Sequence, residues 1–373
     1  MKKYLNQQDM KDRNYTNVFR LIRKKGPLTR RQIEAETGLS WGAVSNVTAR
    51  LIELGYVHEC REIESGASSA GRTPIYLEAD SETHFVIGMD VNASGLRAVM
   101  MNLCGEAVAT VAAPASCETR EALLDAISHI TRDILDYADG KHVLAIGIAL
   151  QGTVDAENGV SVRFPRCAGW RDVPLAAILE GEFGLPVYLE HDPNCTLYAY
   201  SAPSGIEEAI LIRIDRGIGM ALLLGGRIFE RVGALELGHT VVSAGGAPCS
   251  CGNRGCLEAY ASMTGMAERS GLPFETLYER ALAGDGEARA YFDEMTEYLS
   301  LSIANVTRLL NVREIVLSGD MLSCRALFLD RLKQRTREIT GDLDVTFSVT
   351  DVAGAALGGA MIALERYALK LES

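Results

Sequence analysis

One supersecondary pattern occurs twice in the chain, and this repeat limits the possible folds more than any other feature. Each copy has an apolar strand, a turn of small residues and a second apolar strand. The copies read FVIGMDVNASGLRAVMMNLCGEAV and AILIRIDRGIGMALLLGGRIF, with Asp90 and Asp215 in corresponding places. A unit that recurs after about 125 residues is typical of two related lobes. We therefore expect a bilobal α/β body.

The segments around the two copies complete this body. REALLDAISHITRDILDYA predicts an amphipathic helix and HVLAIGIAL a buried strand. LPVYLEHDPNCTLYAY reads as a strand that brings His191, Asp192 and Asn194 to the start of a helix, where they could contact a ligand between the lobes. We place the lobes at residues 84–200 and 201–373, with the C-terminal helix GAALGGAMIALERYAL returning to the first lobe.

Charge is distributed unevenly. Residues 1–75 contain 13 Lys and Arg against 8 Asp and Glu, whereas the whole chain has a net charge of −12, which leaves −17 for the remainder. A basic module joined to an acidic body indicates two separate roles. Neither a signal peptide nor an apolar run of the roughly 18 residues needed to span a membrane is evident, so we expect a cytoplasmic protein without a membrane partner.

Residues 1–80 are predicted to form a winged helix-turn-helix module. Helices are indicated by NYTNVFRLIRKKG, TRRQIEAETG and SWGAVSNVTARLIELG. Thr29 and Ser40 are suitable N-caps, and Gly38 is a suitable C-cap. The inward stripe of the third helix consists of Val44, Val47, Leu51 and Leu54. This arrangement favours binding of operator DNA by the helix-turn-helix.

The segment after the third helix predicts a wing. YVHECREIESGASSAGRTPIYLEAD reads as a strand, a flexible tip and a strand from Ile75 to Leu77, and a cation at the tip can meet a phosphate. The predicted DNA contacts are Thr29, Arg30, Ser40, Trp41, Gly42, Ser45, Asn46, Arg50 and Arg72. The alternative is a small helical bundle for protein contacts, with solvated basic residues.

Three of the nine cysteines lie close together in the glycine-rich stretch HTVVSAGGAPCSCGNRGCLE. Zinc prefers a tetrahedron of thiolates and imidazole, and a structural site takes all four ligands from the protein. His239, Cys249, Cys251 and Cys256 supply that set. In a reducing compartment such clusters are more often metal sites than disulfides, and a Cys-x-Cys disulfide would be strained. We expect structural zinc, with a redox switch as the alternative.

Two glutamates flank this loop. Glu236 precedes His239 by three residues, and Glu258 follows Cys256 by two. A bound metal would position both carboxylates, which could then accept hydrogen bonds from sugar hydroxyls. The alternative is that both are solvated surface residues.

The run ELGHTVV…CSCGNRGCLEAYAS resembles the signature of the ROK family, whose name joins repressors, open reading frames and sugar kinases. The resemblance extends over nearly the whole chain, since GRTPIYLE, GIALQGTVDAENGV and GWRDVPLAAILEGEFGLPVYLEHDPN occur in the family's order. It implies the actin-like, ribonuclease-H-like ATPase fold with two lobes. The N-terminal module implies the repressor branch of the family.

The resemblance also implies a sugar site. Gly152 matches a glycine of the family's substrate loop, and Asp192 matches the base that deprotonates the sugar hydroxyl in family kinases. Glu236, His239 and Glu258 match sugar-binding positions, with one His239 nitrogen on zinc and the other edge toward the sugar.

Other positions depart from the family. His191, which we include among the ligand contacts, stands where the kinases usually have asparagine. Arg163 and Arg166 lie near a segment that is often neutral in the family, which favours an unusual or anionic ligand.

The phosphate loops depart further from those of the kinases. Asp-x-Gly-Gly-Thr, which brings bare backbone to the phosphates, is replaced by DVNAS from Asp90. Gly-Thr-Gly-Ile-Gly is replaced by DRGIG from Asp215, which adds negative charge beside the expected triphosphate. Phosphoryl transfer depends on positioning and charge neutralisation. We therefore expect no ATP or magnesium cofactor, and Asp192 is catalytic only if kinase activity survives.

These observations predict a sugar-responsive regulator of carbohydrate genes, acting as a repressor and as a homodimer or higher homo-oligomer. Sugar binding between the lobes would alter the affinity of the winged helices for operator DNA. Two alternatives stay open: an ATP-dependent sugar kinase with a DNA-binding module, and a regulator whose body docks a protein partner.

Overall fold

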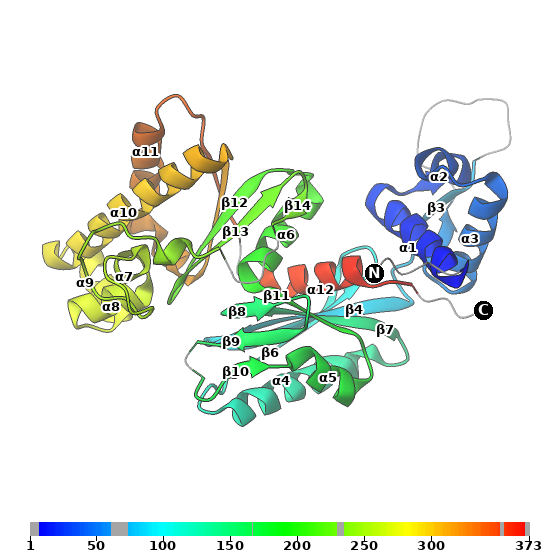
Figure 1. Cartoon of the computed structure of the whole chain (residues 1–373), viewed down its shortest axis with the longest axis horizontal. Helices are drawn as coiled ribbons and strands as arrows, with labels where there is room; N and C mark the ends of the chain where they lie inside the picture. The colour runs from blue at the N-terminus through cyan, green and yellow to red at the C-terminus, as the bar shows by residue number, and fades with distance from the viewer. Residues whose placement is uncertain (1–6, 61–73, 166, 230–234, 351–353, 370–373) are drawn as a thin grey trace.

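An N-terminal unit, a first lobe and a second lobe follow one another along the chain (Figure 1). Helix α12 (Gly354–Arg366) returns from the second lobe and lies on the first lobe beside α6 (Asp192–Ser204). A mainly helical unit followed by an α/β body confirms the predicted fold class. The computed structural model describes residues 7–60, 74–165, 167–229, 235–350 and 354–369.

The N-terminal unit places its helices against a small antiparallel sheet of order β1–β3–β2. Its elements are α1 (Gln7–Lys25), β1 (Leu28–Thr29), α2 (Arg30–Thr37), α3 (Trp41–Glu53), β2 (Val57–Cys60) and β3 (Tyr76–Ala79). Thr29 caps α2 through the Gln32 amide, and Ser40 caps α3 through the Ala43 amide, as predicted. Gly38 ends α2 in the left-handed conformation that glycine adopts readily.

Two features of this unit differ from the sequence prediction. Helix α1 begins at Gln7, whereas the prediction began at Asn14. Strand β1 was not predicted, because two residues are too few to show an alternating pattern. The segment predicted to form the tip of a wing, with Arg72, lies outside the described residues.

The first lobe contains a sheet of order β11–β7–β4–β5–β6. Its strands are β4 (His84–Asn92), β5 (Gly95–Asn102), β6 (Ala107–Ala113), β7 (His142–Leu150) and β11 (Val187–His191), and α4 (Arg120–Leu135) and α5 (Leu175–Phe183) pack with it. β4, β7 and β11 are parallel, and Val91 and His191 both lie opposite Leu150. The carboxyl ends of these strands therefore meet at one edge, which is the usual ligand edge of such sheets.

The two faces of β4 pack against different elements. Phe85, Ile87 and Met89 belong to the buried core shared with α4 and α5. On the other face, a Cβ atom added to Gly88 would come within 1.9 Å of the Ala356 carbonyl oxygen. Glycine at this position allows α12 to lie directly on the sheet.

The second lobe repeats the topology of the first. Its sheet has the order β14–β13–β12–β15–β16, with β12 (Ala209–Ile214), β13 (Ile218–Leu224), β14 (Arg227–Ile228), β15 (Glu314–Ser318) and β16 (Thr346–Val349). β12 is antiparallel to β13 and parallel to β15, just as β4 is antiparallel to β5 and parallel to β7. The prediction of two related lobes is thus confirmed.

Further elements complete both lobes. A second small sheet of the first lobe has the order β10–β9–β8, with β8 (Thr153–Asp155), β9 (Val160–Arg163) and β10 (Arg171–Val173). The helices of the second lobe include α7 (Leu257–Ala261), α8 (Met263–Ser270), α9 (Phe274–Leu282), α10 (Gly286–Leu310) and α11 (Leu329–Thr340). None of the described helices combines the length and the apolar character that crossing a lipid bilayer requires.

Candidate functional site

The four predicted metal ligands lie together in the second lobe. The ligand atoms of His239, Cys249, Cys251 and Cys256 are all within 4.8 Å of one another. Nδ1 of His239 is 3.5 Å from Sγ of Cys249, and Sγ of Cys251 is 3.7 Å from Sγ of Cys256. Tetrahedral zinc with bonds of about 2.0–2.3 Å separates its ligand atoms by about 3.5–3.8 Å. Two pairs of these ligand atoms therefore have the spacing of a tetrahedral zinc site, and the four residues together could hold a metal ion.

Backbone contacts fold the cysteine loop tightly around this cluster. The amide of Cys249 donates to the carbonyl of Asn253 at 2.9 Å, and the amide of Ala247 donates to the Tyr260 hydroxyl at 2.8 Å. Gly255 has a φ of +80°, and an added Cβ would lie 1.7 Å from the Ser243 carbonyl oxygen. Only glycine fits there, which explains the glycine immediately before Cys256.

The two flanking glutamates occupy different surroundings. Glu236 is more than half exposed, with Oε2 3.8 Å from Nε2 of His239. Glu258 accepts hydrogen bonds from the Ile218 amide at 3.1 Å and from the Ser250 hydroxyl at 3.3 Å. A sugar at Glu258 would therefore share a carboxylate that already accepts two hydrogen bonds.

A buried group of charges lies near the start of α6. Nη1 of Arg213, on β12, is 3.2 Å from Oδ2 of Asp192, and its Nε donates to Asp215 at 2.5 Å. Asp90 is buried beside them and accepts a hydrogen bond from the Asn92 amide group at 3.1 Å. The first and second lobes thus meet at an arginine that is surrounded by carboxylates.

Burial controls the ionisation of these groups. It raises the pKa of Asp192 to about 6, against the opposing effect of the Arg213 cation, and it also raises the pKa of Asp90 to about 6. Burial by itself would lower the pKa of Arg213, but the carboxylates of Asp192 and Asp215 raise it instead. Arg213 therefore stays charged, while Asp192 and Asp90 bind protons more readily than an exposed aspartate does.

His191 lies next to this group and is neutral at physiological pH. Its Nε2 is 3.5 Å from Oδ1 of Asp192, and burial lowers its pKa to about 4. The carboxylates of Glu190 and Glu236 act in the opposite direction on that pKa. Glu236, beside the cysteine loop of the second lobe, is therefore close enough to affect the charge of His191 in the first lobe. Predicted ligand residues of the two lobes thus lie near each other.

Glu190 ties the start of α6 to α12. Its Oε1 accepts hydrogen bonds from the His191 amide at 2.9 Å and from the Asn194 side chain at 2.8 Å. Its Oε2 pairs with Arg366 at 2.5 Å, and Arg366 also donates to the Leu189 carbonyl at 3.0 Å. The residues that precede and begin α6 are thereby fixed relative to the C-terminal helix.

Gly152 lies in the turn after β7, at the edge where the parallel strands end. Its φ is +98°, and an added Cβ would come within 2.2 Å of the Arg163 carbonyl oxygen. This position requires glycine for its backbone conformation. The match of Gly152 to the glycine of the family's substrate loop is therefore explained by backbone geometry.

The backbone amides of the first phosphate loop already have partners within the protein. Asn92 Oδ1 accepts from the amides of Ser94 at 2.8 Å and Gly95 at 3.1 Å, while the Gln151 side chain accepts from the Ala93 amide at 2.9 Å. In the second loop, Asp215 pairs with Arg213 and accepts a hydrogen bond from the Asp320 amide. A nucleotide phosphate would need free hydrogen-bond donors here. The amides of the first loop already donate to side chains of the protein, and Asp215 in the second loop is itself an acceptor with two partners.

The predicted DNA contacts other than Arg72, which lies outside the described residues, are on α2, on α3 and at their N-termini. Trp41, the first residue of α3, is 50% exposed. Asn46, in the middle of the same helix, is also exposed. Arg50 pairs with Glu53 at 2.8 Å. Arg30 is held within the unit by the Thr48 hydroxyl at 2.9 Å and by Glu59 at 3.0 Å.

Sequence reasoning missed Arg213, Glu190 and Arg366. Arg213 had a visible signal, because it is a lone charge in the apolar strand AILIRI and stands two residues before Asp215, on the same face of an extended chain. The pairing of Glu190 with Arg366 joins positions that are 176 residues apart. No local pattern predicts such a contact.

The fold and the site together define a class of protein: two α/β lobes of matching topology, a His/Cys cluster in the second lobe and an added N-terminal unit. The ROK family profile matches residues 86–364. The chain belongs to the ROK family.

Regulators are among its relatives in sequence. The DNA-binding transcriptional dual regulator NagC of Escherichia coli (strain K12) is 27% identical over 348 residues, covering 87% of this chain and 84% of NagC. The xylose repressor of Bacillus subtilis (strain 168) is 24% identical over 334 residues, covering 86% of this chain and 85% of the repressor.

Solved structures show the same fold. A ROK family transcriptional regulator, a homologue of the E. coli Mlc protein, has a TM-score of 0.81 at 24% identity and covers 95% of this chain and 97% of its own. A ROK family glucokinase from Streptomyces griseus, solved with glucose and AMPPNP, has a TM-score of 0.64 at 24% identity and covers 75% of this chain and 99% of its own. The kinase thus leaves a quarter of this chain unmatched.

Proposed function

We propose that this chain is a cytoplasmic, sugar-responsive transcriptional regulator that represses carbohydrate genes. The N-terminal unit binds operator DNA, and a sugar binds between the lobes near Gly152, His191, Asp192 and the cysteine loop. Regulators among the relatives support this proposal, because they cover 86–87% of this chain in sequence and 95% in structure, whereas the kinase structure covers 75%.

The observation that carries the proposal is the pairing of Glu365, near the end of α12, with α1. Its carboxylate is 2.8 Å from Nη2 of Arg23 and 3.1 Å from Nζ of Lys24. The Arg20 guanidinium donates to the Glu365 carbonyl. The adjacent Arg366 is bound to Glu190 beside the start of α6. Neighbouring residues of one helix therefore contact the ligand-binding region on one side and the DNA-binding unit on the other.

Apolar packing strengthens this connection. Val18 and Ile22 of α1 share a buried core with Leu364 of α12. Tyr56 stacks on His84 of the first lobe, with ring centroids 4.1 Å apart. Because close-packed interfaces shift between discrete arrangements, a displacement of α12 on ligand binding repositions the N-terminal unit.

The site geometry favours a regulator over a kinase. Asp192, the residue at the family's base position, is paired with Arg213, and the amides of the first phosphate loop are hydrogen-bonded internally. Phosphate loops need free donors, and these amides supply none. The pairing with Arg213 opposes proton uptake by Asp192, but burial still raises the pKa of Asp192 to about 6. The phosphate loop is therefore the feature that disfavours a kinase.

We further propose that His239, Cys249, Cys251 and Cys256 bind one zinc ion. The spacing of their ligand atoms fits a tetrahedral site. Zinc would act structurally, by holding closed a loop that carries His239 and ends next to Glu258. His239 directs Nδ1 toward Cys249 and leaves Nε2 on the side of Glu236.

Operator recognition by such units commonly uses a homodimer, because paired half-sites lie about one helical turn apart. We therefore propose a dimer whose two N-terminal units bind neighbouring half-sites. Ligand binding changes their relative position and hence the affinity for DNA.

The test is fluorescence anisotropy of the intact protein on DNA from upstream of its own and neighbouring genes, titrated with sugars and sugar phosphates. Specific binding that a member of the panel weakens supports the proposal. A protein that binds these fragments no better than unrelated DNA would exclude it, and sugar-dependent ATP turnover would favour the kinase.

A further inference from the structure

Two arginines of the first lobe lie directly opposite each other in the small sheet β8–β9–β10. Arg163 on β9 and Arg171 on β10 are paired in the antiparallel ladder, so their side chains share one face of the sheet. Like charges in directly opposed positions destabilise a sheet. The pair therefore carries an energetic cost that a bound anion would remove.

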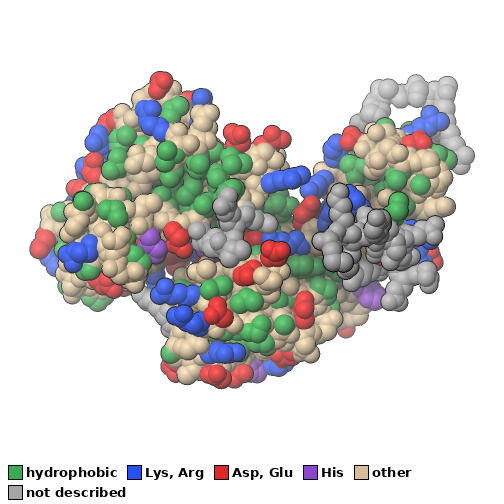
Figure 2. All heavy atoms as spheres, viewed as in Figure 1, with side chains coloured by type: hydrophobic (Ala, Val, Ile, Leu, Met, Phe, Trp, Pro, Cys, Tyr) green, Lys and Arg blue, Asp and Glu red, His purple; other side chains and the backbone are tan. Residues whose placement is uncertain are grey.

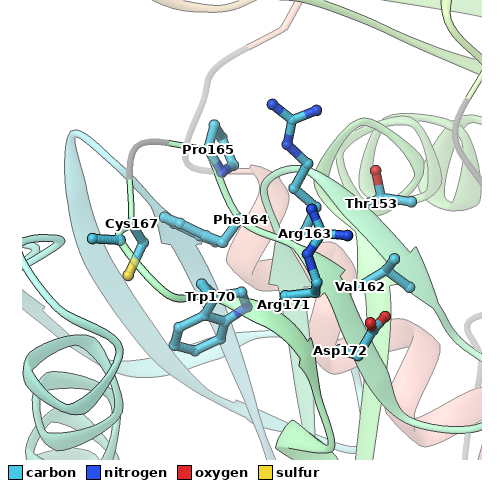
Figure 3. A pocket seen from close by; sticks show the side chains of 10 residues that line it. Thr153, Val162, Arg163, Phe164, Pro165, Cys167, Trp170, Arg171 and Asp172 are labelled. Carbon is cyan, nitrogen blue, oxygen red and sulfur yellow. The ribbon is translucent and has the colours of Figure 1, made fainter.

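Neither guanidinium has a compensating partner among the described residues. No ion pair or hydrogen bond joins Arg163 or Arg171 to any of these residues, whereas Arg132 of the same lobe pairs with Glu182. Asp172 lies beside the pair, but Figure 3 shows its carboxylate next to Val162 and apart from both guanidinium groups. The acidic body thus contains two adjacent cations with free donors.

These arginines line a cavity of about 640 Å³, which is large enough for a sugar phosphate (Figure 3). In Figure 2, basic side chains gather on the part of the first lobe that carries β8–β10, close to its boundary with the second lobe. Thr153, Phe164 and Trp170 line this cavity together with the two arginines.

Buried aromatic residues hold the arginine-bearing strands in place. Trp170 and Phe164 are 4% and 2% exposed, and their ring centroids lie 5.8 Å apart. Nε1 of Trp170 donates to the Ser161 hydroxyl at 2.8 Å, which links the residue before β10 to β9. A rigid frame of this kind lowers the entropy cost of presenting two cations to one anion.

The pair is continuous with the predicted sugar site. Thr153 on β8 lies opposite Arg163, and Gly152 immediately precedes Thr153. The backbone of Gly152 lies against the carbonyl of Arg163. A ligand at the Gly152 turn can therefore extend along Thr153 toward the two guanidinium groups.

We propose that Arg163 and Arg171 bind the phosphate group of a phosphorylated sugar whose ring lies near Gly152 and Asp192. This inference rests on the proposed sensor function and specifies its ligand class. A phosphate monoester carries a charge of about −1.5 to −2 at pH 7, which matches two cations, and guanidinium groups bind phosphate oxygens in a bidentate manner. A carboxylate, with a single charge, matches only one of them.

Isothermal titration calorimetry of the intact protein, without DNA, tests the assignment. The probes are N-acetylglucosamine and its 6-phosphate, xylose and its 5-phosphate, glucose and its 6-phosphate, and glucuronate. The variants are Arg163→Gln, Arg171→Gln and the double variant. Arg227→Gln, an exposed arginine on β14, is the control for the change in net charge.

We expect at least one phosphate ester to bind ten times more tightly than its parent sugar. Each single variant should weaken that ester about tenfold and leave the parent sugar within twofold, whereas Arg227→Gln should change neither. Esters that bind no better than their parents, preferential binding of glucuronate, or variants without effect would each overturn the assignment.

Operator anisotropy with the same compounds separates this inference from the proposed function. If a neutral sugar binds and alters specific DNA binding, the regulator proposal stands and the phosphate site is wrong. If no compound binds and DNA binding never responds, both are wrong.

Discussion

Arg213 forms an ion pair with Asp192, with 3.2 Å between Nη1 and Oδ2, and thereby links β12 of the second lobe to the start of α6. The same guanidinium pairs with Asp215 at 2.5 Å. The side chains of Arg213 and Asp192 are both almost fully buried. The residue at the position of the kinase base is therefore part of a structural charge group that joins the lobes.

Replacing Arg213 should destabilise the body. Arg213→Met leaves Asp192 and Asp215 without their cation, and removal of one partner of a buried pair costs about 3–5 kcal/mol. Urea unfolding at pH 7.5 should show this loss. The control Arg227→Met, at an exposed position, should change the free energy of unfolding by less than about 0.5 kcal/mol. Equal stability of the two variants would contradict the assigned role of Arg213.

The raised pKa of Asp192 predicts a pH-dependent effect of Asp192→Asn. Because the folded-state pKa is about 6 and the unfolded value about 3.9, the stabilising contribution of Asp192 is present below pH 4 and lost as the pH rises through 6. The stability of the variant relative to wild type should therefore increase by about 2 kcal/mol between pH 4 and pH 7. A pH-independent difference would contradict the assigned pKa.

His191→Gln should show the opposite trend. The folded-state pKa of His191 is about 4, below the unfolded value of about 6.5. Its stabilising contribution is present above pH 6.5 and is lost as the pH falls toward 4. Relative to wild type, the variant should therefore gain stability on acidification. Urea unfolding of both variants over pH 4–7 compares the two slopes directly.

The zinc proposal predicts about one zinc ion per chain in purified protein, measured by elemental analysis. Cys251→Ser removes one of four ligands and should lower the zinc content and the melting temperature, because the loop around Cys256 loses its closure. Cys104→Ser, at an exposed cysteine of the first lobe, is the matched control and should retain the metal. Metal-free wild-type protein with an unchanged melting temperature would refute the proposal.

DNA binding should depend on α3. Arg50→Ala should weaken operator binding and reduce the slope of log K against log salt by about 1, as expected for loss of one phosphate contact. Asn46→Ala, on the exposed side of α3, should reduce the preference for operator over unrelated DNA. Anisotropy at several salt concentrations measures both quantities. Unchanged binding by both variants would mean that another surface contacts DNA.

Local patterns in the sequence predict much of this architecture. The two strand-turn-strand copies correspond to β4–β5 and β12–β13, and the Thr29, Gly38 and Ser40 caps delimit α2 and α3. These features depend on near neighbours in the chain, such as periodicity and capping. The predicted ligands from His239 to Cys256 also converge, because they lie within one short loop.

Contacts between distant segments could not be predicted in the same way. Arg213 meets Asp192 only after the two lobes pack together, and Glu190 meets Arg366 only after α12 returns to the first lobe. The opposition of Arg163 and Arg171 depends on the register of β9 and β10, which a one-residue shift would abolish. Such relationships follow from tertiary packing.

Helix α12 is proposed to couple the ligand-binding region to the N-terminal unit, and Glu365→Gln tests this coupling most directly. This variant weakens the ion pairs with Arg23 and Lys24 but lies away from the proposed ligand residues. Glu182→Gln, which removes the surface pair with Arg132, is the matched control. Calorimetry should show that both variants bind the active sugar with wild-type affinity.

The decisive measurement is the operator dissociation constant with and without that sugar, determined by anisotropy for wild type and both variants. We predict that the ligand-induced change in wild type and Glu182→Gln is at least tenfold and that Glu365→Gln reduces it to threefold or less, since coupling energies of this kind are about 1–3 kcal/mol. A Glu365→Gln protein that responds to the sugar as strongly as wild type would contradict coupling through α12.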